Sequence, residues 1–349
     1  GAMNVAQRGT SSTSISYQTV DRFQPKWANT DEDCTQSQHA LTSADTGPWE
    51  KGFMKSLHIQ NGNQTSGAGT SDNVTLEYKL ESQDTATCGW DFKSSTSFLT
   101  FSFWVKSSVA QEFLCQFYNS DTNKIYTFNY TVTSANTWQK ITHKLKGDPS
   151  LSFNMDNGAG LEIGWYLFVG TDQTAASSSA NETWATYSGT TSKKDMTSTW
   201  YTTNDATWEI TGVQLEVGEV ASEFEHRSYG DELRRCKRYY EILYPERANP
   251  CWTHSATHAN CRLTWEVEKR ATPTCTLKGS TSDIPGASDD HVSVYDQNGW
   301  NTWASLSFTE ANKWNTRVTA VMAAGSFTAG WAVGLYFYND SGIHVSAEL

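Results

Sequence analysis

Aromatic residues are the side chains of this chain best suited to holding a ligand. The sequence contains 15 Trp, 15 Tyr and 15 Phe in 349 residues, an unusually large share of tryptophan. Sugars present C–H faces that stack on aromatic rings, and their hydroxyl groups bond to amides, carboxylates and backbone. An aromatic-rich chain that is also rich in Ser, Thr and Asn is therefore typical of carbohydrate recognition.

Four of these aromatic residues lie in one polar segment, 171–205, which has no long strand pattern. Loops of this length are uncommon and often functional. We take Trp184, Tyr187, Trp200 and Tyr201 as candidate sugar-stacking residues. The same rings could instead anchor the loop to a core, because most large aromatic side chains are substantially buried. The sequence leaves both interpretations open.

A fifth candidate, Trp104, lies in a predicted strand. In the segment 100–107, apolar side chains alternate with Ser102, Trp104 and Lys106, so the two sets face opposite ways. Trp104 is therefore expected to point away from the apolar side and to line a groove with polar neighbours, unless it is itself a core residue. Trp165 shares its face with apolar residues and is expected in the core.

The elements that must position these residues are short strands. Many alternating segments of five to eleven residues follow one another, separated by Gly, Asp and Asn turns, which predicts an all-β sandwich. The exception is a capping box at Ser228 and Asp231, followed by an apolar stripe over 231–241. It predicts one short helix, and the basic residues 234–238 suit its C-terminal end.

Composition argues against several function classes. The net charge of −12 disfavours binding to nucleic acid or anionic lipid, and the absence of an apolar run of about 18 residues argues against membrane insertion. No hydrolase, metalloprotease or phosphate-binding motif occurs, so we expect no enzyme. Residues 289–291 (Asp-Asp-His) are the one compact metal-like cluster, and a turn explains them better.

The cysteines match no known framework. The chain has seven, an odd number, and no pair has the spacing of a zinc ribbon. Cys251 and Cys261 could pair across a hairpin, which the sequence does not decide. Mostly free thiols suit assembly in a bacterial cytoplasm.

The segment 210–240, ITGVQLEVGEVASEFEHRSYGDELRRCKRYY, resembles a junction in bacteriophage tail-fibre and other virion surface proteins. The resemblance implies a carbohydrate-binding jelly roll, a small β domain at the fibre tip, a homotrimer, and a virion location beside other virion proteins. It implies no cofactor, although sugar-binding jelly rolls often hold a structural calcium ion. Weaker matching blocks lie at 4–9, 20–23, 100–107, 137–140, 161–170, 267–274 and 347–349.

The expected layout follows from the strand density on either side of the helix. Residues 1–3 are typical of an expression scar, 4–225 form the jelly roll, 226–241 the connecting helix, and 242–349 a C-terminal β-sandwich tip. The expected function is non-catalytic attachment to a host surface polysaccharide or oligosaccharide. A polysaccharide depolymerase and a purely structural virion decoration protein remain alternatives, and Trp300–Trp314 is the alternative place for a binding surface.

Overall fold

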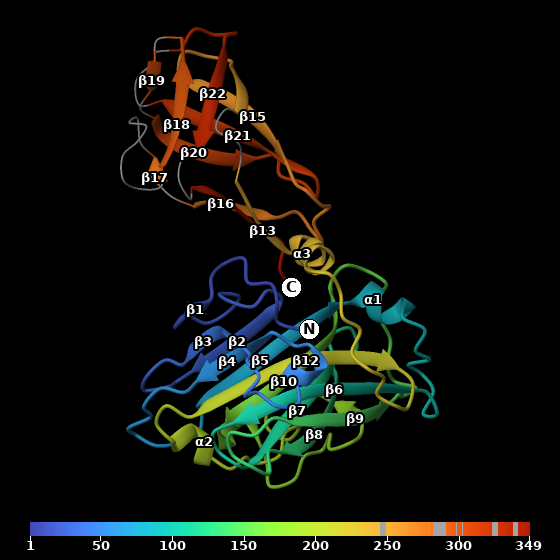
Figure 1. Cartoon of the computed structure of the whole chain (residues 1–349). Coiled ribbons are helices and arrows are strands. Elements are labelled where there is room, and N and C mark those ends of the chain that lie inside the picture. Colours follow the sequence, from blue (N-terminus) through green and yellow to red (C-terminus); the bar gives the residue numbers. More distant parts are fainter. Residues whose placement is uncertain are drawn as a thin grey trace. The chain divides into compact units, whose positions relative to one another are not determined.

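The computed structural model describes residues 1–244, 249–278, 280–281, 291–297, 299–301, 303–322, 327–337 and 341–349. Asp289 and Asp290, and the side chains of His291, Trp300 and Trp303, lie outside this description. The chain is all-β and divides into two compact units, Gly1–Glu232 with Leu349 and Leu233–Glu348 (Figure 1).

The first unit is a jelly-roll sandwich of two six-stranded antiparallel sheets, which we call sheet A and sheet B. Consecutive strands often belong to different sheets, as expected where the chain crosses between two layers. Sheet A has the order β1 (Ser11–Ser12), β3 (Thr35–Ala40), β4 (Lys55–Gln60), β12 (Thr207–Val217), β6 (Phe98–Ser107), β9 (Gln139–Lys146). Sheet B has the order β11 (Ala185–Thr186), β8 (Lys124–Thr131), β7 (Glu112–Asn119), β10 (Ala159–Val169), β5 (Asn73–Glu81), β2 (Phe23–Ala28).

The core lies between these sheets and is dominated by aromatic rings. Phe101 and Phe103 of β6 are fully buried, as the alternation in that strand predicts. Trp165 of β10 is also fully buried, and its ring centroid lies 5.8 Å from that of Phe101 and 6.0 Å from that of Phe103. The prediction that Trp165 is a core residue is therefore confirmed. Short helical turns lie between the strands of this unit: η1 (Trp49–Lys51), α1 (Ser82–Thr87), η2 (Thr171–Gln173) and α2 (Thr199–Thr202).

The helix α3 (Tyr229–Lys237) begins at the predicted capping box. The backbone N–H of Asp231 donates to Ser228 Oγ at 3.2 Å, and Ser228 Oγ donates to Asp231 Oδ2 at 2.6 Å. Arg234, Arg235 and Lys237 occupy its last turn, where positive charge suits the helix dipole. The helix ends four residues before the predicted limit, because the chain from Tyr240 onward pairs as a strand. None of the helices in the described residues is long and apolar enough to cross a bilayer.

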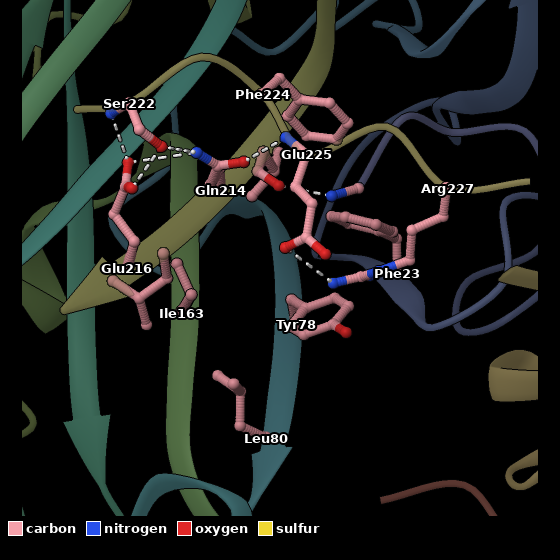
Figure 2. Close-up of a pocket in the computed structure, with 13 residues that line it drawn as sticks. Phe23, Tyr78, Leu80, Ile163, Gln214, Glu216, Ser222, Phe224, Glu225 and Arg227 are labelled. Atoms are coloured by element: carbon pink, nitrogen blue, oxygen red, sulfur yellow. Dashed lines mark hydrogen bonds and ion pairs between the residues drawn. The ribbon is translucent and has the colours of Figure 1, made fainter. Parts of the chain in front are cut away.

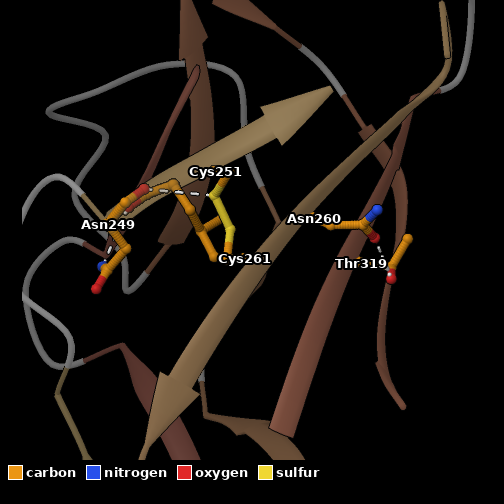
Figure 3. The surroundings of a disulfide bond; sticks show 6 residues. Asn249, Cys251, Asn260, Cys261 and Thr319 are labelled. Carbon is orange, nitrogen blue, oxygen red and sulfur yellow. Dashed lines mark hydrogen bonds between the residues drawn. A yellow bond between two sulfur atoms is a disulfide. The ribbon is translucent and has the colours of Figure 1, made fainter. Parts of the chain in front are cut away.

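The second unit is a smaller β-sandwich. Cys251 and Cys261 face each other across β14 (Asn249–Thr253) and β15 (His258–Thr264) and form a disulfide, with their Cα atoms 4.4 Å apart (Figure 3). One sheet has the order β13 (Tyr240–Leu243), β23 (Gly342–Ser346), β16 (Thr274–Lys278). The other has the order β17 (Ser280–Thr281), β18 (His291–Asp296), β22 (Ala332–Phe337), β14 (Asn249–Thr253), β15 (His258–Thr264), β21 (Asn315–Met322), β20 (Trp303–Thr309), with β19 (Gly299–Asn301) beside β18.

Candidate functional site

The candidate site lies on the outward face of sheet A, the face turned away from the core. The alternation in β6 that buries Phe101 and Phe103 turns Ser102 and Trp104 to this face. Trp104 is partly buried there against a small apolar cluster that is separate from the main core. The other members of that cluster are Leu41, Phe53 and Trp138, with Ala2, Trp49 and Phe224 packed on them.

Two glycines hold the indole ring of Trp104 in place. A Cβ atom at Gly47 would lie 2.7 Å from Trp104 Cζ3, and one at Gly212 would lie 3.0 Å from Trp104 Cδ1. Both glycines have positive φ, +97° and +63°, a region that side-chain-bearing residues rarely adopt. The backbone therefore touches the ring at two places, and a ring that is already ordered loses little entropy on binding a ligand.

A cavity of about 300 Å³ opens beside this ring. Three aromatic side chains line it, those of Phe53, Trp104 and Phe224, and the Phe53 and Phe224 rings meet edge to face at 4.8 Å. The backbone of Gly212 and five polar side chains complete the lining. These side chains are Ser102, Lys140, Lys51, Ser222 and Glu223. Apolar ring faces beside a few polar groups form the kind of surface that a sugar ring can fit.

The basic residues of this cavity differ in their surroundings. Lys51 Nζ lies 3.4 Å from Glu223 Oε2 in an exposed ion pair. Lys140 lies directly opposite Trp104 in the β6–β9 ladder and is exposed. Its ammonium group can therefore donate to a ligand that stacks on the indole.

A second cavity, of about 290 Å³, shares Ser222 and Phe224 with the first (Figure 2). Phe23 and Tyr78 form its apolar wall, and Gln214, Glu216, Glu225 and Arg227 contribute polar groups (Figure 2).

In that second cavity, hydrogen bonds within the protein already occupy the carboxylate of Glu216. It accepts from the Ser222 N–H at 2.9 Å, from Ser222 Oγ at 2.6 Å and from Gln214 Nε2 at 3.1 Å. Partial burial raises the pKa of Glu216, but the Ser222 bonds outweigh it, so the pKa is lowered overall. This carboxylate therefore stays ionised and holds the segment 222–225 against β12.

A charged row runs across the strands beside Trp104. Lys106 Nζ lies 2.9 Å from Glu209 Oε1 and 3.1 Å from Asp45 Oδ1, and 4.9 Å from the centre of the Trp138 ring. Trp138 Nε1 donates to Asp45 Oδ1 at 3.0 Å. His39 and His58 lie next to Glu209, and within the described residues these three form a group of metal-ligating side chains.

Three of the predicted stacking residues are buried anchors. Trp184, Trp200 and Tyr201 are 8%, 0% and 1% exposed. Trp184 Nε1 donates to the Lys146 carbonyl at 2.8 Å, Trp200 Nε1 to the Thr207 carbonyl at 3.0 Å, and Tyr201 Oη to Asp72 Oδ2 at 3.0 Å. Because core packing covers their rings, the anchoring interpretation that the sequence left open describes them.

The remaining two candidates do not come together. Tyr187 is 39% exposed and packs edge to face on Tyr118 at 5.5 Å, and it lines neither cavity described above. Of the five candidates, Trp104 is the one that lines either of these two cavities. Sequence reasoning missed Phe53, Phe224 and Lys140, which come from three distant segments. The alternation in 139–146 indicates that Lys140 points outward, but it does not indicate that Lys140 pairs with Trp104.

Neither the comparison with protein-family models nor that with curated proteins found a match. Solved structures gave slight likenesses. The enzymatically active domain of bacteriophage CBA120 tailspike protein 4 has a TM-score of 0.31 at 10% identity, covering 56% of this chain and 19% of that one. The family 11 carbohydrate-binding module of a cellulosomal cellulase of Clostridium thermocellum has a TM-score of 0.29 at 12% identity, covering 61% and 98%. Discoidin II of Dictyostelium discoideum has a TM-score of 0.18 at 10% identity, covering 90% and 94%. Likenesses of this size carry no argument about what the chain binds.

Proposed function

We propose that this chain binds a glycan without cleaving it, and that the sugar stacks on Trp104 in the cavity on the outward face of sheet A. The observation that carries the proposal is the setting of that ring. Glycine backbones hold it in place, and it borders a cavity of about 300 Å³. The ammonium group of Lys140 lines the same cavity and can donate to sugar oxygens.

The biological setting that we propose is host attachment by a bacteriophage virion. Its support is the resemblance of the segment 210–240 to a tail-fibre junction. The partners would then be a cell-surface polysaccharide or oligosaccharide and other virion proteins.

A depolymerase is the rival function, and one carboxylate of the second cavity argues against it. Glycoside hydrolysis needs a carboxylic acid whose pKa is raised, with a second carboxylate about 5–10 Å away. The pKa of Glu216 is lowered, which is the wrong direction for a general acid. A purely structural role would not need a cavity that three aromatic rings line.

Replacement of Trp104 by Ala should weaken glycan binding about fivefold or more, because one stacking ring contributes on the order of 1 kcal/mol beyond area burial. A glycan array identifies the ligand, and isothermal titration calorimetry measures the loss. Trp104→Phe keeps a ring and should bind with an intermediate affinity. Tyr187→Ala removes an exposed ring outside the cavity and should leave the affinity unchanged. If Tyr187→Ala weakens binding and Trp104→Ala does not, the site lies in the segment 171–205.

Since a single site of this kind is weak, attachment should depend on several copies acting together. We expect the purified chain to be a homotrimer, with a mass in light scattering three times its 38.9 kDa. A monomeric mass at micromolar concentration, together with full binding to a glycan-coated surface, would contradict a role for multivalency.

A further inference from the structure

We propose that the outward face of sheet A carries a zinc site formed by His39, His58 and Glu209. These residues lie on three neighbouring strands, β3, β4 and β12. His58 is directly opposite Glu209 in the β4–β12 ladder. On β3, Ser37 pairs with His58, and His39 comes two residues later and pairs with Ser56. The potential ligand atoms of all three side chains lie within 4.8 Å of one another. The site is separate from the Trp104 cavity, and it does not depend on glycan binding.

His58 is the fixed nitrogen ligand of this group. Its side chain is buried and lies directly opposite Glu209 in the β4–β12 ladder. Ser37 Oγ lies 3.3 Å from His58 Nδ1, and this hydrogen bond orients the ring.

Glu209 is the fixed oxygen ligand. Lys106 Nζ lies 2.9 Å from its Oε1, and Ser56 Oγ donates to its Oε2 at 2.7 Å. These two partners hold the carboxylate in one orientation. Oε2 also lies 4.0 Å from Nδ1 of the exposed His39.

His39 is the ligand of this group that is exposed to solvent. Its side chain is 45% exposed, and its ring stacks on that of His58 with centroids 3.8 Å apart. A metal ion lies in the plane of each imidazole that binds it, so stacked rings must splay before both can coordinate one ion. His39 is free to make this rotation because it is exposed, whereas His58 and Glu209 stay in place.

The types of ligand atom determine which metal ion this site prefers. Two imidazole nitrogens and one carboxylate oxygen, with a fourth position open to water, match the tetrahedral preference of Zn²⁺. Calcium and magnesium prefer all-oxygen ligand sets, so this site with two nitrogen ligands should bind them weakly. Lys106 and Asp45 complete the surrounding charge, because the Lys106 ammonium group bridges the carboxylates of Glu209 and Asp45.

The test is calorimetric titration of ZnCl₂ into the full-length protein, free of any histidine tag, near neutral pH. We expect one Zn²⁺ per chain, with a raised melting temperature. His39→Ala should weaken binding at least about tenfold and remove the shift in melting temperature, and Ser56→Ala should weaken it about tenfold through Glu209. His39→Ala should fold normally, since the side chain is exposed.

His254→Ala is the matched control. His254 and His258 form a second histidine pair, with ring centroids 5.2 Å apart, in the other unit. This variant should bind zinc as the original chain does. The proposal is overturned if the chain binds no Zn²⁺ at about 100 µM metal, where a micromolar site would be saturated. It is also overturned if His39→Ala binds zinc as tightly as the original chain, or if His254→Ala loses binding instead.

Discussion

The first unit is expected to lose several kcal/mol of folding free energy as the pH falls from about 6.5 to about 4, because His58 and His143 are held neutral by burial. Burial lowers the pKa of His143 to about 4. Its ring lies 3.9 Å from that of Phe128 and nearly parallel to it, and Tyr126 Oη lies 3.0 Å from Nε2. Burial, together with the nearby His39, lowers the pKa of His58 to about 4.

The sign follows from proton counting. The unfolded histidines take up protons near pH 6.5, whereas the folded ones do so near pH 4. Between these values the unfolded chain binds more protons, so stability is complete above pH 6.5 and is lost as the pH falls toward 4. The difference corresponds to about 3 kcal/mol for each histidine at most, since solvent still reaches part of His143.

Urea unfolding at a series of pH values measures this loss, and hydrogen exchange by mass spectrometry assigns it to the first unit. His143→Gln cannot titrate, so the pH-dependent loss should fall to about half. His226→Gln replaces an exposed histidine of the same unit and should change nothing. A pH profile that is flat between 6.5 and 4, or one that His143→Gln leaves unaltered, would contradict this account.

Local patterns in the sequence predict much of this fold. Alternation places Trp104 and Phe103 on opposite faces of one strand, and the structure confirms it. The all-β class and the position of the helix start at Ser228 also follow from patterns within about ten residues. Such features are predictable because neighbours in the sequence determine them, through side-chain periodicity and end capping.

The site itself depends on pairing between distant strands, which a single sequence does not reveal. Trp104 meets Lys140 because β6 and β9 pair in one register, and a shift by one residue would turn Lys140 inward. His58 meets Glu209 across 151 positions for the same reason. Trp200 shows the converse: the polar neighbourhood in the sequence left exposure and burial both open, and the fold brings the ring into the core.

The substitution Lys269→Met is expected to destabilise the second unit by about 3–5 kcal/mol, because it leaves a buried carboxylate without its counter-ion. The Lys269 and Glu241 side chains are 0% and 1% exposed, and Nζ lies 3.0 Å from Glu241 Oε1. Lys269 Nζ also donates to the Lys237 carbonyl. In the described part of the chain, no hydrogen-bond donor faces the Glu241 carboxylate besides this ammonium group.

The double variant Lys269→Met/Glu241→Leu separates the cost of an unpaired charge from that of lost packing. Replacing a whole buried ion pair by apolar side chains of similar volume is often neutral or stabilising, so the double variant should recover most of the loss.

Arg317→Met is the exposed control. The Arg317 guanidinium lies 2.9 Å from Glu310 Oε1, and the two side chains are 38% and 59% exposed. The cost of this substitution should stay below about 1 kcal/mol. Urea unfolding followed by hydrogen exchange in the second unit gives the three values. If Lys269→Met costs no more than Arg317→Met, the buried ion pair does not stabilise this unit.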